Sequence, residues 1–375
     1  MIPVNTPLLD GEERTLLNTC IDTAWISAEG AYVEQFERDF AAFVGRTHGI
    51  AVNNGSSALE LALAALDIGP GDEVILPTFT IISCASAVVR AGATPVFVDC
   101  EPDTWNMQVD ALTELITPRT RAIMAVHIYG LPVDMGPLLA LARTHDLAVI
   151  EDAAEAHGLH YDGKPCGSFG NLSTFSFYAN KLVTTGEGGM VMSDDAELAA
   201  RCRSLRNLAF GREHRFQHEA LGWNFRMSNL QAALGVAQTA QLPRFLNIKR
   251  TMGDRYTRNL RDVPGLQLPV ARTAHAENAY WVYGVVLDDT LPFDAAAMMR
   301  ALAARGIGTR PFFWPMHEQP VLRQRGLVGS RRFPVAERLA RRGFYLPGGA
   351  GLSLSAVDEV CDTLREILAR GEVPA

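Results

Sequence analysis

Lys181 is the residue of this 375-residue chain whose surroundings most clearly indicate chemistry. It follows an apolar stretch, residues 173–177, that predicts a buried strand, and it precedes a glycine-rich segment, residues 186–189. Most lysines lie on solvated surfaces, whereas the small residues near this one leave room for a flat cofactor. Burial favours the neutral amine, whose lone pair attacks carbonyl groups, so we expect Lys181 to form a Schiff base. The alternative is an ordinary salt bridge at the surface.

A carboxylate, Asp152, lies 29 positions before this lysine. It ends the apolar run of residues 147–152, which predicts a strand, and ligands of α/β proteins bind at the carboxyl ends of strands. There the carboxylate could keep a pyridine nitrogen protonated, which makes the ring an electron sink. Capping of the next turn is the alternative. If the strand that ends at residue 177 lies beside this one, Asp152 and Lys181 face the same crevice.

A third segment predicts a phosphate site. Residues 53–57 precede the helical pattern of residues 58–66. Backbone N–H groups and the hydroxyls of Ser56 and Ser57 would converge at the N-terminus of that helix, where anions bind. Taken alone, the segment is explained better by an ordinary helix cap.

The elements that must position these residues alternate along the chain. Strands are expected at 73–77, 94–99, 122–126 and 147–152, and helices between them at 83–91 and 135–145. This order predicts an α/β fold whose mainly parallel sheet has helices on both faces. A helix is expected at 228–241, and we place a domain boundary near residue 245. The large domain is then 1–245, and the smaller α+β domain is 246–375, with a strand at 280–287 and helices at 294–305 and 357–369. In that strand the aromatic residues are expected to pack in the core.

Composition excludes several classes of protein. The chain is 48% hydrophobic and 20% charged with a net charge of −8, so no basic surface for nucleic acid is expected. The N-terminal residues lack the pattern of an export signal, and no apolar run approaches the ~20 residues of a membrane span, which predicts a cytoplasmic protein. The six cysteines are scattered, which predicts reduced thiols, and no residues have the spacing of a metal site.

Five ordered motifs resemble those of the DegT/DnrJ/EryC1/StrS family of pyridoxal-phosphate sugar aminotransferases. The resemblance extends from Ile2 to about Leu368. It implies the type I fold of pyridoxal-phosphate enzymes, with a seven-stranded sheet in the large domain and pyridoxal 5′-phosphate as cofactor. The motifs are Asn54-Gly55-Ser56-Ser57-Ala58-Leu59, Glu151-Asp152-Ala153-Ala154, Phe175-Ser176-Phe177 with Lys181, Gly186-Glu187-Gly188-Gly189, and Gly222-Trp223-Asn224-Phe225-Arg226-Met227-Ser228.

The resemblance also implies a role for each motif residue. Lys181 would form the Schiff base with the cofactor and move protons. Asp152 would pair with the pyridine nitrogen, and Glu155 would lie near the ring 3-oxygen. The cofactor phosphate would be bound by Ser57, Ser176 and the backbone at Ser56. Asn224 would reach the cofactor phosphate of a second subunit, which implies a homodimer with shared active sites; a core-facing turn is the alternative for this residue.

The substrates implied are L-glutamate as amino donor and a nucleotide-linked keto sugar as acceptor. Residues 25–27, 127–130 and 310–317 favour amination at C4 of GDP-4-keto-6-deoxy-D-mannose, a step in the synthesis of O-antigen or another glycan. Arg310, Phe312 and His317 are the candidates for substrate binding. Arg310 could pair with a phosphate or carboxylate or stack on its aromatic neighbours, and His317 could contact the sugar or stabilise its own loop.

Two segments depart from the family pattern. Ile81 stands where relatives often stack an aromatic ring on the cofactor, and residues 205–210 differ from the turn expected for a GDP-linked substrate. A dTDP- or UDP-linked 4-keto sugar, or 8-keto-3,8-dideoxy-octulosonate, is therefore an alternative acceptor. Related dehydratases have histidine at the place of Lys181, which counts against that activity. A non-catalytic regulator that binds the cofactor is a further alternative, although it would require a partner-binding module.

Overall fold

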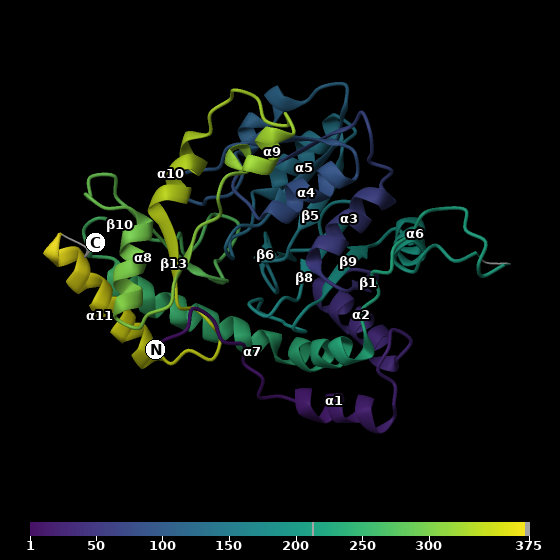
Figure 1. The fold of residues 1–375 in the computed structure, drawn as a ribbon, viewed down its shortest axis with the longest axis horizontal. Helices are drawn as coiled ribbons and strands as arrows, with labels where there is room; N and C mark the ends of the chain where they lie inside the picture. The colour runs from purple at the N-terminus through teal and green to yellow at the C-terminus, as the bar shows by residue number, and fades with distance from the viewer. Residues whose placement is uncertain (212–213, 372–375) are drawn as a thin grey trace.

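The computed structural model describes residues 1–211 and 214–371, and Figure 1 shows their arrangement. The larger part contains a seven-stranded sheet with the order β1-β9-β8-β5-β4-β2-β3. Strands β8, β5, β4, β2 and β3 are parallel, and β9 pairs antiparallel with both β8 and β1. The strands are β1 (His48–Val52), β2 (Glu73–Pro77), β3 (Thr94–Val98), β4 (Thr120–Val126), β5 (Ala148–Asp152), β8 (Leu172–Ser176) and β9 (Gly189–Ser193).

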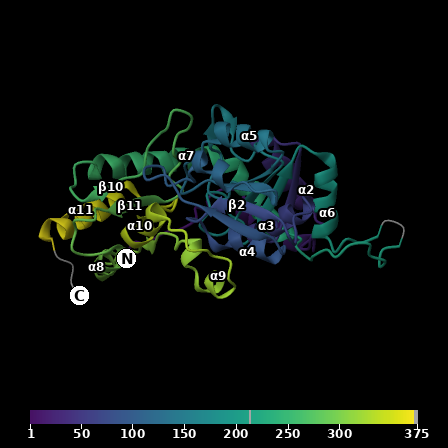
Figure 2. The same cartoon turned by 90° about the horizontal axis from the view of Figure 1, so that it is seen from above.

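Helices cover both faces of this sheet, which explains why β2 and β9 are buried along their whole length. Successive side chains of a strand point to opposite faces. Ile50 and Val52 accordingly join one apolar cluster with α3 and α4, and Ala51 joins a second cluster with α2 and α5. Figure 2 shows β2 between α4 and α5. The bounds are α1 (Glu13–Asp22), α2 (Ala31–Val44), α3 (Gly55–Ala65), α4 (Ile82–Arg90), α5 (Met135–Thr144) and α6 (Ala196–Arg206), with short elements η1 (Val109–Ala111), η2 (Thr113–Leu115), β6 (His160–Tyr161) and β7 (Lys164–Pro165).

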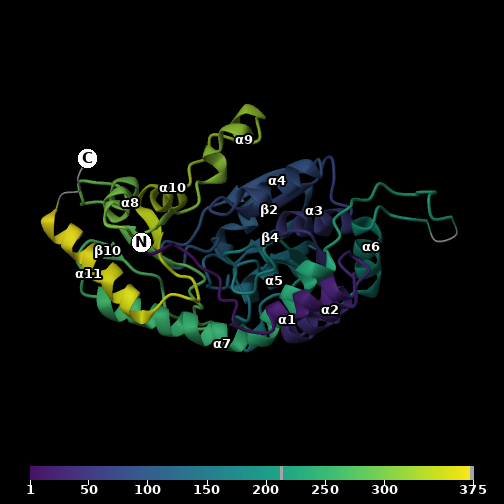
Figure 3. The same cartoon turned by 60° about the horizontal axis from the view of Figure 1, so that its bottom comes forward.

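One long helix, α7 (Asn229–Leu260), runs beneath both parts of the molecule (Figure 3). It begins with a capping box in which Ser228 and Gln231 bond each other's backbone N–H groups, an arrangement that satisfies two free donors. The domain boundary expected near residue 245 falls inside this unbroken helix, so its position stays a prediction.

The smaller part contains a four-stranded antiparallel sheet with the order β10-β11-β13-β12. The third apolar cluster of the molecule lies in this part and is built from this sheet, α8 and α11. Ile2 pairs with Ile307, so the N-terminus lies against this part. The elements are β10 (Leu266–Gln267), β11 (Tyr283–Leu287), α8 (Ala295–Ala304), β12 (Arg310–Pro311), η3 (Met316–Glu318), α9 (Pro320–Gln324), α10 (Pro334–Arg342), β13 (Gly343–Leu346) and α11 (Leu354–Arg370).

The expected α/β fold is confirmed, and β2 occupies the predicted residues 73–77. The strand expected over 280–287 differs, because β11 begins only at Tyr283. Tyr280 has a φ of +50°, which is incompatible with an extended chain. Trp281 therefore lies in a loop before the strand. No helix within 1–211 or 214–371 is both long and apolar enough to cross a bilayer.

Candidate active site

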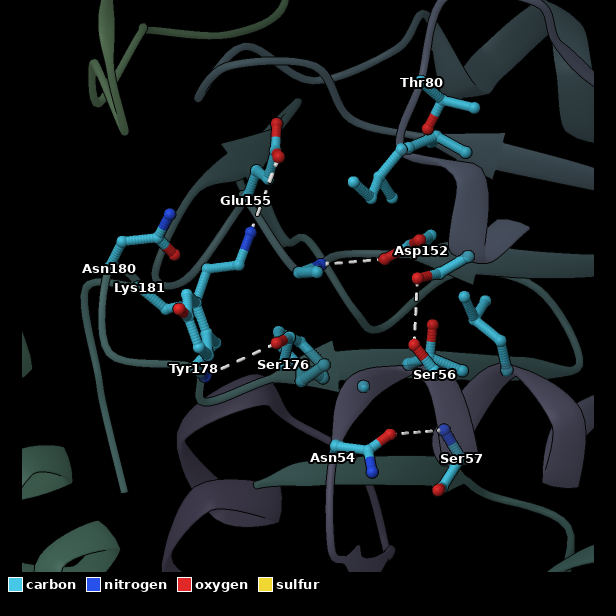
Figure 4. Close-up of a pocket in the computed structure, with 18 of the residues that line it drawn as sticks. Asn54, Ser56, Ser57, Thr80, Asp152, Glu155, Ser176, Tyr178, Asn180 and Lys181 are labelled. Carbon is cyan, nitrogen blue, oxygen red and sulfur yellow. Dashed lines mark hydrogen bonds and ion pairs between the residues drawn. The ribbon is translucent and has the colours of Figure 1, made fainter. Parts of the chain in front are cut away.

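A pocket of about 630 Å³ opens where β5 and β8 end, a volume typical of ligand sites. The two strands are parallel neighbours, so Asp152 at the end of one and Ser176 at the end of the other reach the same edge of the sheet. Figure 4 shows these side chains around the pocket. The predicted residues that line it are Ser56, Ser57, Asp152, Glu155, Ser176 and Lys181.

Lys181 lies in the turn that follows β8, where its backbone N–H donates to the carbonyl of Tyr178 at 2.8 Å. Its side chain is 11% exposed and points across the pocket (Figure 4). The amine Nζ lies 3.5 Å from Glu155 Oε1 and 3.8 Å from the centre of the Trp281 ring. A carboxylate and an aromatic face thus hold the amine at the edge of the sheet.

Asp152 is 3% exposed, and its hydrogen-bond donors are both neutral. The N–H of Ala154 donates to Oδ1 at 3.1 Å, and the thiol of Cys84 donates to Oδ2 at 3.3 Å. Burial raises the pKa of Asp152, since removal from water disfavours the charged form. Burial and the nearby Asp152 charge also raise the pKa of Cys84 well above its usual value, which keeps the thiol a donor. In the sequence, Cys84 is one of six scattered cysteines, and nothing there indicates a contact with Asp152.

Glu155 faces the amine from the loop after β5. Its Oε2 accepts a hydrogen bond of 2.9 Å from the N–H of Tyr129, and its Oε1 faces Lys181. Burial raises the pKa of Glu155 to about 7, although Lys181 and the Tyr129 N–H both oppose the rise. This carboxyl group therefore exchanges its proton near neutral pH, which suits a residue that works in acid–base chemistry.

The N-terminus of α3 forms the opposite end of the pocket. Asn54 caps the helix, because its Oδ1 accepts from the N–H of Ser57 at 2.8 Å. The N–H groups at the first positions of a helix have no intrahelical acceptor and can bind an anion. A Cβ on Gly55 would lie 2.7 Å from Cβ of Ser176, so glycine is needed for α3 to approach β8 this closely. The segment is both a helix cap and a cradle suited to phosphate.

An aromatic wall closes the pocket on the side of the smaller part. The sequence does not predict this wall, because its pattern places Trp281 in a strand that packs in the core. The indole N–H of Trp281 donates to the carbonyl of Asn180 at 2.9 Å. A Cβ on Gly130 would lie 2.5 Å from the Trp281 backbone nitrogen, so the loop requires glycine there. Phe313 and Tyr345 complete the wall.

A buried lysine, Lys249 of α7, supports this wall from behind. Its amine donates to the carbonyls of Trp281, at 3.0 Å, and Gly348. Burial lowers the pKa of Lys249 to about 7. Because both acceptors belong to loops of the smaller part, this lysine joins those loops to the helix beneath the pocket.

Two buried polar atoms in the pocket have no hydrogen-bond partner within the described residues, namely Thr174 Oγ1 and Asn180 Oδ1. Native proteins rarely leave such atoms unpaired, which indicates that a ligand meets them. An anion cradle, a buried carboxylate and an amine lie around the same space. These residues fit a phosphorylated pyridine that carries an aldehyde.

Four other candidates lie elsewhere. Asn224 is exposed and does not line the pocket of its own chain, so the core-facing alternative is wrong. Arg310 lines a smaller, adjoining pocket. His317 is 3% exposed and bonds Thr78 at 2.8 Å, and Phe312 is 3% exposed and packs against Trp105. Neither of the last two lines either pocket, and their predicted contact with a substrate finds no support in this geometry.

Two groups of potential metal ligands come together in the described part of the chain. They are His127, Glu151 and Cys166, and His317, Glu318 and Glu337. In the first group, Glu151 already accepts from His127 Nε2 at 2.8 Å and from the N–H groups of Gly167 and Phe169. This carboxylate acts as a scaffold for a turn, and the expectation of a protein without a metal stays a prediction.

Comparisons with known proteins agree with this site. The profile of the DegT/DnrJ/EryC1/StrS aminotransferase family matches residues 7–365. GDP-perosamine synthase of Caulobacter vibrioides is 42% identical over 367 residues, which are 98% of each chain. GDP-perosamine synthase of Escherichia coli O157:H7 is 40% identical over 365 residues, 97% of this chain and 98% of the relative. The solved aminotransferase TlmJ of Streptoalloteichus hindustanus has a TM-score of 0.92 at 33% identity, with 99% of both chains covered. The resemblance and the fold type predicted from the motifs are confirmed.

Proposed function

Because the chain belongs to the DegT/DnrJ/EryC1/StrS aminotransferase family, we propose that it aminates C4 of GDP-4-keto-6-deoxy-D-mannose with nitrogen from L-glutamate. The product would be GDP-perosamine, made by a cytoplasmic homodimer for O-antigen or a similar glycan. The observation that carries this proposal is the 42% identity to a GDP-perosamine synthase over 98% of both chains. The pocket supports it with an amine and two buried carboxyl groups at one edge of the sheet.

Pyridoxal 5′-phosphate, when bound, would supply an electron-withdrawing ring that stabilises negative charge on the carbon next to the transferred nitrogen. Ser57, Ser176 and the backbone at Ser56 would hold its phosphate at the α3 N-terminus. Asp152 would accept a hydrogen bond from the protonated ring nitrogen, and its burial strengthens that bond.

Lys181 would do the proton transfers. Its amine would hold the cofactor until an amino donor takes that place, which would free Nζ. The free Nζ would then remove the proton at Cα of glutamate in the first half of the cycle and add the proton at C4 of the sugar in the second. Glu155, 3.5 Å from Nζ, orients the amine and faces it with a carboxyl group whose pKa of about 7 lets it gain or lose a proton at little cost.

Dimer formation is supported by residues 207–211 and 214–221, which follow α6 and project away from the body of the molecule (Figure 2). Phe216 and Leu221 are 79% and 92% exposed, and exposed apolar patches mark surfaces that bind a partner. Asn224 lies just beyond them and is exposed. In a homodimer its amide would reach the cofactor phosphate of the partner subunit.

The test is a panel of acceptors incubated with ¹⁵N-labelled L-glutamate and the purified protein, with the products read by mass spectrometry. GDP-4-keto-6-deoxy-D-mannose should acquire the label. Incorporation only into a dTDP- or UDP-linked 4-keto sugar, or into the eight-carbon keto acid, would overturn the acceptor, and no incorporation into any of them would overturn the activity. Lys181→Ala should lower turnover by roughly 100- to 10,000-fold, the usual contribution of an acid–base group.

A further inference from the structure

A side pocket of about 250 Å³ adjoins the catalytic pocket. Four residues line both pockets, namely Tyr178, Asn180, Trp281 and Tyr345. Complete ligand sites usually measure about 300–1,000 Å³, so this space suits one end of a molecule whose other end lies in the catalytic pocket. The side pocket is therefore a subsite of the same reaction centre.

The charge of this subsite is positive. Among the residues that the structure describes, Arg310 is the only charged one in its lining, and no aspartate or glutamate of that part of the chain lines it. The catalytic pocket differs, because it contains Asp152, Glu155, Glu60 and Glu187. Arg310 is exposed, and its guanidinium makes no ion pair within residues 1–211 and 214–371. A guanidinium that faces a concave, acid-free space is arranged to bind an anion.

Strand pairing holds Arg310 beside the catalytic pocket. In β12 and β13, Arg310 lies directly opposite Tyr345. Opposed residues of antiparallel strands have their Cβ atoms about 5 Å apart on the same face of the sheet. Tyr345 lines both pockets, so this pair links the guanidinium to the space around Lys181. Asn180, whose Oδ1 is buried without a partner, adds an amide at the same junction.

We infer that the side pocket is an oxyanion subsite in which Arg310 binds a negatively charged group of a substrate while the reacting carbon lies near Lys181. This inference rests on the proposed function. Both proposed substrates carry such a group, since the donor has carboxylates and the nucleotide sugar has a diphosphate next to its sugar. The planar guanidinium binds two oxygens of either group side by side, which fixes direction as well as distance.

The two half-reactions identify the substrate that uses this subsite. In the first half-reaction, the loss of visible cofactor absorption is measured at several L-glutamate concentrations. In the second, the return of that absorption is measured at several nucleotide-sugar concentrations. Arg310→Gln should weaken the apparent affinity for one of these substrates by roughly 10- to 100-fold, the value of a charge-assisted bidentate contact. Arg310→Lys should recover part of the loss, because it retains the charge but not the fork.

Arg300→Gln is the matched control. Arg300 is an exposed arginine of α8 that lines neither pocket, and its replacement should change neither half-reaction. Loss confined to the glutamate half assigns the subsite to the donor carboxylate, and loss confined to the sugar half assigns it to the diphosphate. An Arg310→Gln enzyme with both halves unchanged, or with both weakened equally, overturns the inference.

Binding to the protein without cofactor provides a readout that does not depend on turnover. Calorimetry with glutarate and with GDP should show weaker binding of one ligand to Arg310→Gln than to wild type and Arg300→Gln. Unaltered binding of both overturns the inference. If wild type performs neither half-reaction, the proposed function fails by itself, whereas an active wild type with an indifferent Arg310 leaves that function standing.

Discussion

Replacement of Glu155 by glutamine should stabilise the cofactor-free protein at alkaline pH. The side chain is 6% exposed, and burial raises its pKa from 4.5 to about 7. A raised pKa means that the folded state holds a proton which the unfolded state releases. Stability from this group is complete below pH 4.5 and is lost as the pH rises through 7. Glutamine has nearly the same shape and carries no charge, so Glu155→Gln removes this loss.

The magnitude follows from the width of this window. One pKa unit corresponds to 1.36 kcal/mol, so a shift from 4.5 to about 7 is worth about 3 kcal/mol. The free energy of unfolding of Glu155→Gln minus that of wild type should therefore increase by about 3 kcal/mol between pH 4.5 and pH 8.5. The increase should be spread over the interval, at no more than ~1.4 kcal/mol per pH unit.

The assay is urea unfolding of cofactor-free protein at one protein concentration and at several pH values from 4.5 to 8.5. Glu359→Gln is the control, since Glu359 is an exposed residue of α11 and its replacement should change stability by under ~0.5 kcal/mol at every pH. A Glu155→Gln difference that stays constant with pH, or that decreases, would refute the reasoning. It would mean that attraction to Lys181 outweighs the cost of burying the carboxylate.

Three further outcomes are expected. Asp152→Asn should lower kcat by roughly 10- to 100-fold, the worth of one charge-assisted hydrogen bond, and unchanged steady-state rates would remove Asp152 from the reaction. Trp281→Leu should accelerate acylation of Lys181 in the cofactor-free protein, measured by mass spectrometry, because the ring that covers Nζ at 3.8 Å is removed; an equal rate would contradict that role. Burial lowers the pKa of His157 to about 3, so stability is complete above pH 6.5 and is lost as the pH falls toward 3. The stability advantage of wild type over His157→Gln should thus shrink by up to ~1.4 kcal/mol per unit below pH 6.5, as measured by urea unfolding, and a constant advantage would argue against a neutral buried imidazole.

Residues at the ends of regular elements were predictable from the sequence. Asp152 ends a strand recognisable from its apolar run, and Ser57 begins a helix recognisable from its cap. Parallel strands bring such ends to one edge of the sheet, so the position of each followed from local pattern and sheet topology. Lys181 was found for the same reason, because it lies in the turn directly after β8.

The aromatic wall could not be predicted in this way. Trp281 reaches the pocket because the chain reverses direction at Tyr280, with a φ of +50°, and because Gly130 of the larger part allows the loop to approach. Both conditions depend on how the smaller part packs against the sheet. The alternating aromatic pattern in the sequence gives no information about that packing, so it predicts a longer strand. For His317 the sequence left two roles open, contact with the sugar and stabilisation of its own loop, and its bond to Thr78 favours the second.

The two buried acids of the site differ in the charge of the groups that contact them. Glu155 faces the cation of Lys181, whereas the hydrogen bonds to Asp152 come from an N–H and a thiol, neither of which carries charge. A buried carboxylate with neutral donors is costly to ionise, and a protonated ring nitrogen would supply the missing charge. The ionised form of Asp152 would then be favoured in the loaded site, where it would keep the ring cationic. We therefore expect cofactor binding to stabilise the fold more strongly in wild type than in Asp152→Asn, since only the carboxylate gains a charged partner.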